Sequence, residues 1–259
     1  MSFGGEQTDF VKSLTEDKCD PELGAKVYEH LHSLGFETVD YTNYHPAVAF
    51  ESLTYAIRDA YSNLGLDVHN DPSIKDTPTR FAKMFVGELT KGLNYDFFPK
   101  CTATPNGVLA DEDRPETSRS VGGSDELHQV MKGRVDEVVQ VKNIRITSLC
   151  EHHLQTIDGF CHIAYLPKDK VLGLSKFARV AEFFAARPQI QERMTEQIYH
   201  ALRLILGTDD IAVVVDAVHF CMRARGVKQP ESWTQTNKMG GVFLTKPEAR
   251  KEFLDAISS

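Results

Sequence analysis

Apolar residues recur at helical spacing through roughly the first hundred residues of the chain. This pattern predicts three helices, each ending at or near a glycine, over residues 22–34, 46–65 and 77–92. Pro46 and Pro78 stand where a helix accepts proline, at its first position, and Thr77 is the expected N-cap of the third helix. We therefore expect an N-terminal helical region over residues 1–100.

The pattern changes from about residue 135 onward, where stretches of alternating apolar and polar residues are typical of strands. Strands are predicted over residues 135–149, 160–166, 211–223 and 241–244. The alternation slips at Lys142 and Asn143, which indicates a β-bulge. Apolar stripes at helical spacing predict helices over residues 175–186, 189–206 and 247–257.

The order strand, strand, helix, helix, strand, strand predicts an α+β fold, in which two helices cover one face of an antiparallel sheet. We expect this catalytic core to span residues 131–259. Residues 101–130 separate it from the helical region and are rich in proline, glycine and charge, so they are expected to form a loop or an insertion.

Composition narrows the class of protein. With 259 residues, 41% of them hydrophobic, the chain can bury a substantial core. Its net charge of −8 argues against nucleic acid or an anionic membrane as the main partner. No apolar run reaches the ~20 residues of a membrane-spanning helix, and the N-terminal segment lacks the features of a signal peptide. Five cysteines are too few and too odd in number for a disulfide framework, so we expect a cytoplasmic protein with free thiols.

Two short motifs suggest a metal centre. Cys150 and His153 have the C-x-x-H spacing that allows one turn to present a thiolate and an imidazole to a zinc ion. His219 and Cys221 lie two residues apart in a predicted strand, and such residues point to the same face. Three soft protein ligands with a fourth position open to water are typical of catalytic zinc, so the pattern favours metal-assisted hydrolysis.

Other interpretations of these motifs remain open from spacing alone. Cys161 or His219 could supply a fourth ligand and close a purely structural zinc site. Without any metal, Cys150 could be a buried apolar thiol and the histidines satisfied polar groups. The spacing also does not decide which of His152 and His153 would bind the metal.

A second cluster predicts an anion site. Ser175, Lys176 and Arg179 follow Gly173 at the start of a predicted helix, and we call these three residues the phosphate cradle. Further candidate cations are Arg225, just beyond Cys221, and Arg80. The alternative is a solvated basic face. Gln191 and Glu192 begin the next helix, where they could cap its first turn or bind the edge of a purine base.

The ordered set of motifs closely resembles GTP cyclohydrolase I of the bacterial, zinc-dependent type. The resemblance extends from about Pro46 to the C-terminus and is carried by Cys150-Glu151-His152-His153, Gly173-Leu174-Ser175-Lys176 with Arg179, Arg187-Pro188-Gln189-Ile190-Gln191-Glu192-Arg193, and His219-Phe220-Cys221-Met222 with Ala224-Arg225-Gly226. It implies a tunnelling fold whose subunits join their sheets into rings, with two rings stacked as a homodecamer. The implied active sites lie between subunits, where Arg80 could arrive from a neighbouring chain.

The resemblance also implies a role for each candidate residue. Zn²⁺ would be held by Cys150, His153 and Cys221, with His152 and His219 as the acid/base pair. The guanine would be held by Gln191 and Glu192. The triphosphate would be held by Ser175, Lys176, Arg179, Arg225 and Arg80.

The implied reaction converts GTP and water to 7,8-dihydroneopterin triphosphate and formate, with C8 of the purine expelled by hydrolysis. Two rival functions are a nitrile reductase of the same fold, which uses a cysteine nucleophile and NADPH, and a non-catalytic zinc-stabilised ring or binding protein. The double histidine argues against the first, and the complete set of polar residues argues against the second. The downstream pathway (folate, tetrahydrobiopterin or deazapurine), allosteric regulation and the metal loaded in the cell stay open.

Overall fold

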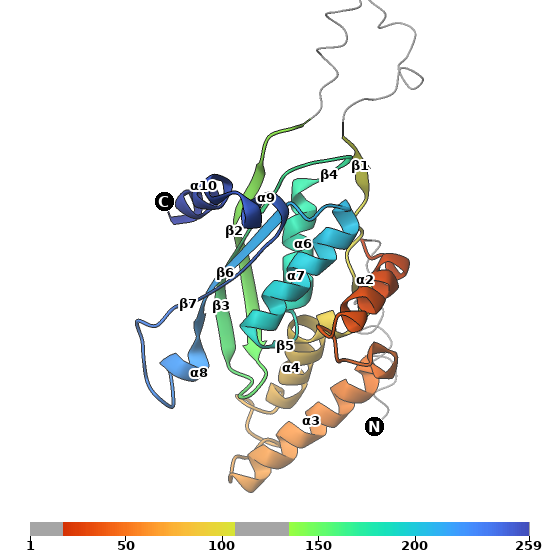
Figure 1. Cartoon of the computed structure of the whole chain (residues 1–259). Coiled ribbons are helices and arrows are strands. Elements are labelled where there is room, and N and C mark those ends of the chain that lie inside the picture. Colours follow the sequence, from red (N-terminus) through yellow and green to blue (C-terminus); the bar gives the residue numbers. More distant parts are fainter. Residues whose placement is uncertain (1–17, 107–134, 259) are drawn as a thin grey trace, which may run out of the picture.

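The computed structural model describes residues 18–106 and 135–258 (Figure 1). The expected N-terminal helices are confirmed. Their bounds, with those of the short helical turns between and after them, are α2 (Pro21–Ser33), η1 (Tyr41–Asn43), α3 (Pro46–Asn63), α4 (Thr77–Met84), η2 (Phe85–Leu89), η3 (Lys91–Leu93) and η4 (Tyr95–Phe97). No helix in the described ranges is long and apolar enough to cross a membrane.

The third helix differs in detail from its prediction. Asp76, not Thr77, occupies the N-cap position, so Pro78 is the second helical residue. The α-helix ends at Met84 and continues as a π-helical turn, η2, instead of running on to Gly92. Gly92 itself lies against the backbone of Phe183, where a Cβ would come within 2.0 Å of the carbonyl oxygen. Glycine is therefore required at this position because two backbones approach closely, and Gly92 does not mark the end of a helix.

The predicted antiparallel sheet is confirmed. Its strands are β2 (Val139–Cys150), β3 (Thr156–Tyr165), β6 (Ile211–His219) and β7 (Thr234–Met239), and two residues of β5 (Pro188–Gln189) join the edge beside β2 in parallel. The expected bulge lies at Asn143, which has φ 57° and interrupts the pairing of β2 with β3. The expected loop over residues 101–130 is described only up to Asn106, and there Ala103–Pro105 forms a short strand, β1, paired with β4 (Lys170–Leu172).

The third core strand is shorter than predicted. We expected it to continue to Arg223, but β6 ends at His219 and the next four residues form a helical turn, α8 (Phe220–Arg223). The reason is the length of its neighbours. His219 is paired with Ile157, the second residue of β3, and Ala217 is paired with Thr234, the first residue of β7, so beyond His219 only Thr156 remains opposite.

The predicted fourth strand was wrong. Residues 241–244 begin a helix, α9 (Gly241–Thr245), and the fourth strand is β7, directly before it. The residues of β7 are mostly polar and only half-buried because it is an edge strand, so it lacks the apolar signal on which the prediction relied. Phe243, within the predicted strand, instead packs against Phe253 of the final helix, α10 (Pro247–Ser258), whose prediction is confirmed.

The two central helices, α6 (Leu174–Ala185) and α7 (Gln191–Leu206), cover one face of the sheet as expected (Figure 1). Val213 and Val215 of β6 face these helices in the main core, which also includes Val27 and Leu31 of α2. The N-terminal helical region therefore shares its core with the sheet. Val214, between these two residues, points to the opposite face of the sheet. There it packs with residues of α9 and α10, which therefore cover part of that face.

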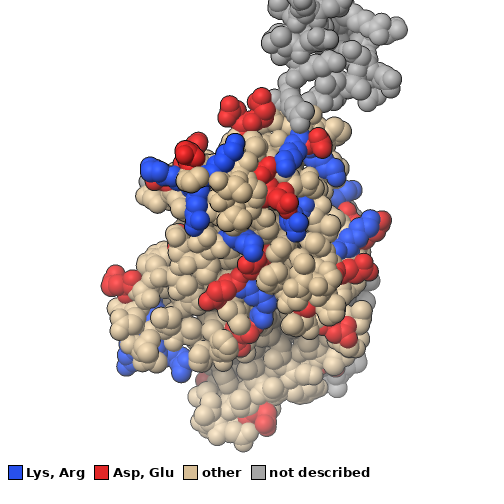
Figure 2. Space-filling model, viewed as in Figure 1, with Lys and Arg blue, Asp and Glu red and all other residues tan. Residues whose placement is uncertain are grey.

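The charged surface is mixed. On the face drawn in Figure 2, basic and acidic side chains are interspersed and neither sign gathers into one broad patch. Some of these charges pair across elements, as Lys238 of β7 does with Glu196 of α7 at 3.0 Å.

Candidate metal centre and active site

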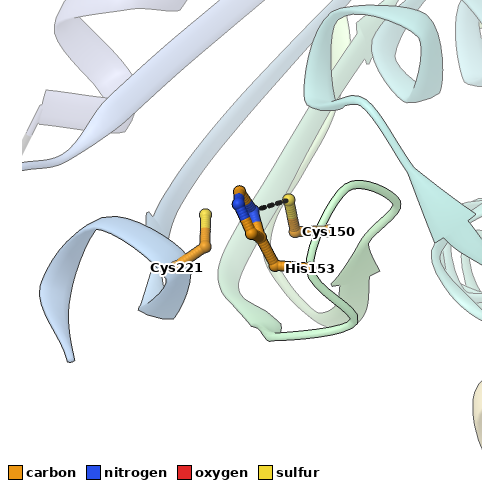
Figure 3. Close-up of side chains that lie close together, drawn as sticks. All are labelled: Cys150, His153 and Cys221. Carbon is orange, nitrogen blue, oxygen red and sulfur yellow. Dashed lines mark hydrogen bonds between the residues drawn. The ribbon is translucent and has the colours of Figure 1, made fainter. Parts of the chain in front are cut away.

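Three potential ligands converge at one end of the sheet. Cys150 is the last residue of β2, His153 lies in the turn that follows, and Cys221 lies on α8 (Figure 3). One ligand atom from each of these residues lies within 4.8 Å of the other two, and Sγ of Cys150 is 3.8 Å from Nδ1 of His153. We call Cys150, His153 and Cys221 the metal group. All three ligands were expected from the sequence, but Cys221 reaches the group from a helical turn and not from a strand.

The turn after Cys150 is held in place by its own backbone. Cys150 accepts a hydrogen bond from Leu154 N at 2.8 Å and donates one to the carbonyl of Gln155 at 2.7 Å. Leu154 has φ 51°, in the left-handed region, which reverses the chain between β2 and β3. His153 is therefore directed back toward Cys150 by a closed turn.

A second brace connects this turn to helix α7. Glu151 forms an ion pair with Arg193, and its backbone nitrogen donates to the carbonyl of Gln189 at 3.1 Å. Gln189 in turn accepts a hydrogen bond from Arg193 at 3.3 Å. No role for Glu151, Gln189 or Arg193 was predicted from the sequence. Glu151 stands next to a candidate ligand, which could have drawn attention to it, but its partner Arg193 is identified only by a tertiary contact.

The donor set suits a divalent soft metal. Burial raises the pKa of the Cys221 thiol, and the neighbouring Cys150 raises it further, while Arg225 opposes both effects. The neutral form of the Cys221 thiol is therefore favoured, and a cation bound beside it would reverse that preference. Zinc binds thiolate at about 2.3 Å and imidazole at about 2.0 Å, so a tetrahedral arrangement separates ligand atoms by roughly 3.5 Å. The 3.8 Å between Cys150 and His153 is close to this spacing.

Cys161 is not available to close the site. It is fully buried in the middle of β3, where it pairs with Ile144 and Val215 and faces the main core. Burial raises the pKa of its thiol far above the usual range. His152, by contrast, is exposed, and its Nδ1 lies 4.0 Å from Sγ of Cys150. A structural site closed by Cys161 is therefore excluded.

His219 is the last residue of β6 and precedes Cys221 of the metal group by two residues. Its Nε2 is 2.7 Å from Oε1 of Gln191, the first residue of α7. Burial lowers the pKa of His219, and the carboxylate of Glu192 opposes this shift. Gln191 is buried, although the sequence suggested that it could face a purine base. Glu192 is exposed and borders an open hollow of about 620 Å³ between α7 and β7.

The phosphate cradle lies at the opposite end of the sheet. It occupies the first turns of α6, next to β4, whereas the far end of α6 leads through β5 to Cys150 (Figure 1). A helix of 12 residues is about 18 Å long, so within one chain the cradle and the metal group are well separated. Lys176 and Arg179 face Cys101: burial raises the pKa of that thiol to about 11, and both cations oppose the shift.

The two remaining cations also differ in position. Arg225 lies close enough to Cys221 to lower the pKa of its thiol. Arg80 lies on α4, with 74% of its side chain exposed, and its guanidinium is 3.5 Å from Asp76. The structure therefore brings Arg225 to the metal group and leaves Arg80 on the helical arm formed by α3 and α4.

Comparison with known proteins identifies the family. A family model described as GTP cyclohydrolase I matches residues 53–258. The chain belongs to the GTP cyclohydrolase I family. It is similar to GTP cyclohydrolase 1 of Aeromonas salmonicida (44% identity over 80% of this chain and 83% of the relative) and of Vibrio cholerae (42% identity over 91% and 97%). It is also similar to that of Yersinia enterocolitica, with 45% identity over 75% of this chain and 76% of the relative.

The GTP cyclohydrolase I match includes every candidate residue. It begins near the predicted limit at Pro46 and contains the metal group, both candidate acid/base histidines, the phosphate cradle, Gln191 and Glu192, and the arginines Arg80 and Arg225. All the candidate residues therefore lie within the stretch of chain that matches the family.

Proposed function

We propose that this chain is a zinc-dependent GTP cyclohydrolase I that converts GTP and water to 7,8-dihydroneopterin triphosphate and formate. The observation that carries the proposal is the convergence of Cys150, His153 and Cys221 beside His219, in a chain that belongs to this family. Three soft ligands without a fourth from Cys161 are typical of a catalytic zinc site.

The metal group would hold Zn²⁺ through two thiolates and one imidazole. When bound, zinc lowers the pKa of water toward neutrality and thus supplies hydroxide for hydrolysis of the purine ring. Arg225 supports this role because its positive charge favours the ionised form of Cys221. The brace from Arg193 and Gln189 to Glu151 would hold the turn that carries His153.

His152 and His219 would move protons during the reaction. The pKa of His219 is lowered by burial, so its ring is neutral near pH 7 and able to accept a proton. His152 is exposed beside Cys150 and would exchange protons from the open side of the site. Two imidazoles with different burial are suited to opposite roles, one as base and one as acid.

Glu192 and the cations would bind the substrate. An exposed carboxylate can accept hydrogen bonds from the ring N–H and amino group of guanine, and Glu192 borders a hollow large enough for a base. The phosphate cradle, Arg225 and Arg80 would bind the triphosphate, whose charge of about −4 requires several fixed cations.

We further propose that the site is completed between subunits of a homodecamer. Within one chain the phosphate cradle and the metal group lie at opposite ends of the sheet, so they would meet only across an interface. The edges of the sheet support assembly with other subunits, because β7 is an edge strand and β2 pairs with β5 at only two residues. Unpaired edges favour pairing with another chain. Five free cysteines suit a cytoplasmic location.

The test is to incubate the purified, zinc-loaded protein with GTP and follow formate release together with the near-ultraviolet absorbance of the pterin. Both signals should develop, both should be lost on chelation, and both should return with zinc. Formate without pterin would indicate a related hydrolase that opens the ring without closing a new one. Neither signal, with zinc bound, would favour the non-catalytic ring protein.

A further inference from the structure

The side chain of Gln191 is buried, only 1% exposed, and its amide is bonded on all sides within the chain. Its nitrogen donates to the carbonyl oxygens of Val215 at 3.0 Å and Thr234 at 2.9 Å, and lies 3.2 Å from the hydroxyl of Thr236. Its oxygen lies 2.7 Å from Nε2 of His219. An amide so engaged has no free donor for a substrate.

The two carbonyls determine which way the amide faces. Carbonyl oxygens only accept hydrogen bonds, so the nitrogen of Gln191 must point at Val215 and Thr234. The reverse orientation would set an oxygen against two oxygens and leave both amide protons without these acceptors. The oxygen of Gln191 is therefore held toward His219.

Two neighbouring hydroxyls agree with this orientation, which the carbonyls already determine. The hydroxyl of Thr195 donates to the backbone carbonyl of Gln191 at 2.9 Å, so its single proton is used. The 2.7 Å bond between the two hydroxyls must then be donated by Thr236. The oxygen of Thr236 therefore presents only lone pairs to the amide nitrogen of Gln191 at 3.2 Å, and the two amide protons are shared among three acceptors.

The orientation of the Gln191 amide determines which ring nitrogen of His219 carries a proton. The amide oxygen of Gln191 can only accept, so Nε2 of His219 must carry a proton. In the neutral ring Nδ1 is then the nitrogen with a free lone pair. We propose that Gln191 is a positioning residue, which fixes the tautomer and orientation of His219 by holding its Nε2–H and so leaves Nδ1 as the ring atom with a lone pair for the reaction. This inference rests on the proposed cyclohydrolase function.

The distinguishing experiment separates turnover from binding. Gln191→Met keeps the length of the side chain and removes the acceptor facing His219. Loss of an orienting partner typically costs about 10–100-fold in activity, so kcat should fall by that factor. The Kd for GTP, measured in the His219→Ala background where turnover is stopped, should change by less than about twofold on adding Gln191→Met. A raised Kd with unchanged kcat would overturn the inference and make Gln191 a substrate contact.

Two further variants guard against a merely structural effect. Thr195→Val removes a hydroxyl from the same buried network but leaves the bond between Gln191 and His219, so it should keep kcat close to wild type. Gln191→Glu retains an oxygen facing His219, and burial favours a protonated carboxyl whose O–H can donate to the carbonyls of Val215 and Thr234, so this variant should keep more of kcat than Gln191→Met. Equal losses in Gln191→Glu and Gln191→Met, or in Thr195→Val and Gln191→Met, would overturn the inference. An inactive wild type would instead refute the proposed function itself.

Discussion

A buried ion pair between Glu37 and Arg187 connects the N-terminal helical region to the sheet. Both side chains are only 2% exposed, and Nη1 of Arg187 lies 2.6 Å from Oε2 of Glu37. Tyr95 donates a further hydrogen bond to Glu37, and Arg187 donates to the carbonyl of Gly92. Burial alone would raise the pKa of Glu37, but Arg187 and the hydrogen bonds outweigh it and lower the pKa below 4.5.

We predict that Glu37→Gln destabilises the protein strongly, because it preserves the shape of the side chain and leaves the charge of Arg187 buried without a partner. Removing one member of a buried pair costs about 3–5 kcal/mol, which for a chain of this size lowers the melting midpoint by roughly 6–20 °C. Thermal unfolding followed by circular dichroism measures this shift. The double variant Glu37→Gln with Arg187→Met should recover much of the loss, since no uncompensated charge remains.

The same chemical change on the surface provides the control. Glu22 forms an exposed pair with Lys26 within α2, so Glu22→Gln should leave the midpoint close to wild type. The effect of Glu37→Gln should also depend on pH. A carboxyl with a lowered pKa stabilises the folded state above its unfolded pKa and loses that contribution as the pH falls through its folded pKa. The difference between Glu37→Gln and wild type should therefore shrink below about pH 4.5. A midpoint within about 2 °C of wild type at pH 7 would refute the reasoning.

Three other predictions concern the site. Cys150→Ser and Cys221→Ser should each lose bound zinc together with activity, measured by metal analysis and formate release; full activity without metal would contradict the assignment. His219→Ala should retain zinc and lose turnover by about 10²–10⁴-fold, the usual contribution of a general acid or base, and normal turnover would remove His219 from the mechanism. Arg179→Ala should raise the KM for GTP by roughly 10–100-fold, from the loss of a charge-assisted hydrogen bond worth about 1.5–3 kcal/mol, and an unchanged KM would exclude its phosphate role.

Local signals were enough to predict most of the elements. Helices α2, α3, α6 and α7 have apolar stripes with glycine or proline near their ends, and the bulge at Asn143 interrupts a clear alternation. The errors arose where a neighbour decides the structure. β6 stops because β3 and β7 begin opposite it, and β7 is polar because it lies at an edge. Neither fact is contained in the segment itself.

In the candidate site too, local sequence signals predict some features and tertiary contacts decide the others. The spacing of Cys150 and His153 suffices to place them in one turn, and the structure brings Cys221 to them. What the motifs did not provide is the environment of each side chain. Gln191 was expected to cap its helix or to bind a purine base, yet it is buried and its amide donates to carbonyls on two strands that are distant in sequence. Long-range hydrogen bonding of this kind leaves no periodic signal along the chain.

The position of helix α6 has a genetic consequence. It places the phosphate cradle at one end of the sheet and the metal group at the other, so a site shared between subunits would draw each half from a different chain. Arg179→Ala, assayed at GTP concentrations far below its raised KM, and Cys221→Ser, which lacks zinc, should then complement each other when their products assemble together. Random mixing in a symmetric ring would restore roughly one site in four. Co-expression of the two variants should thus rescue activity that neither shows alone, and a mixture as inactive as its components would indicate that each subunit builds its site from its own residues.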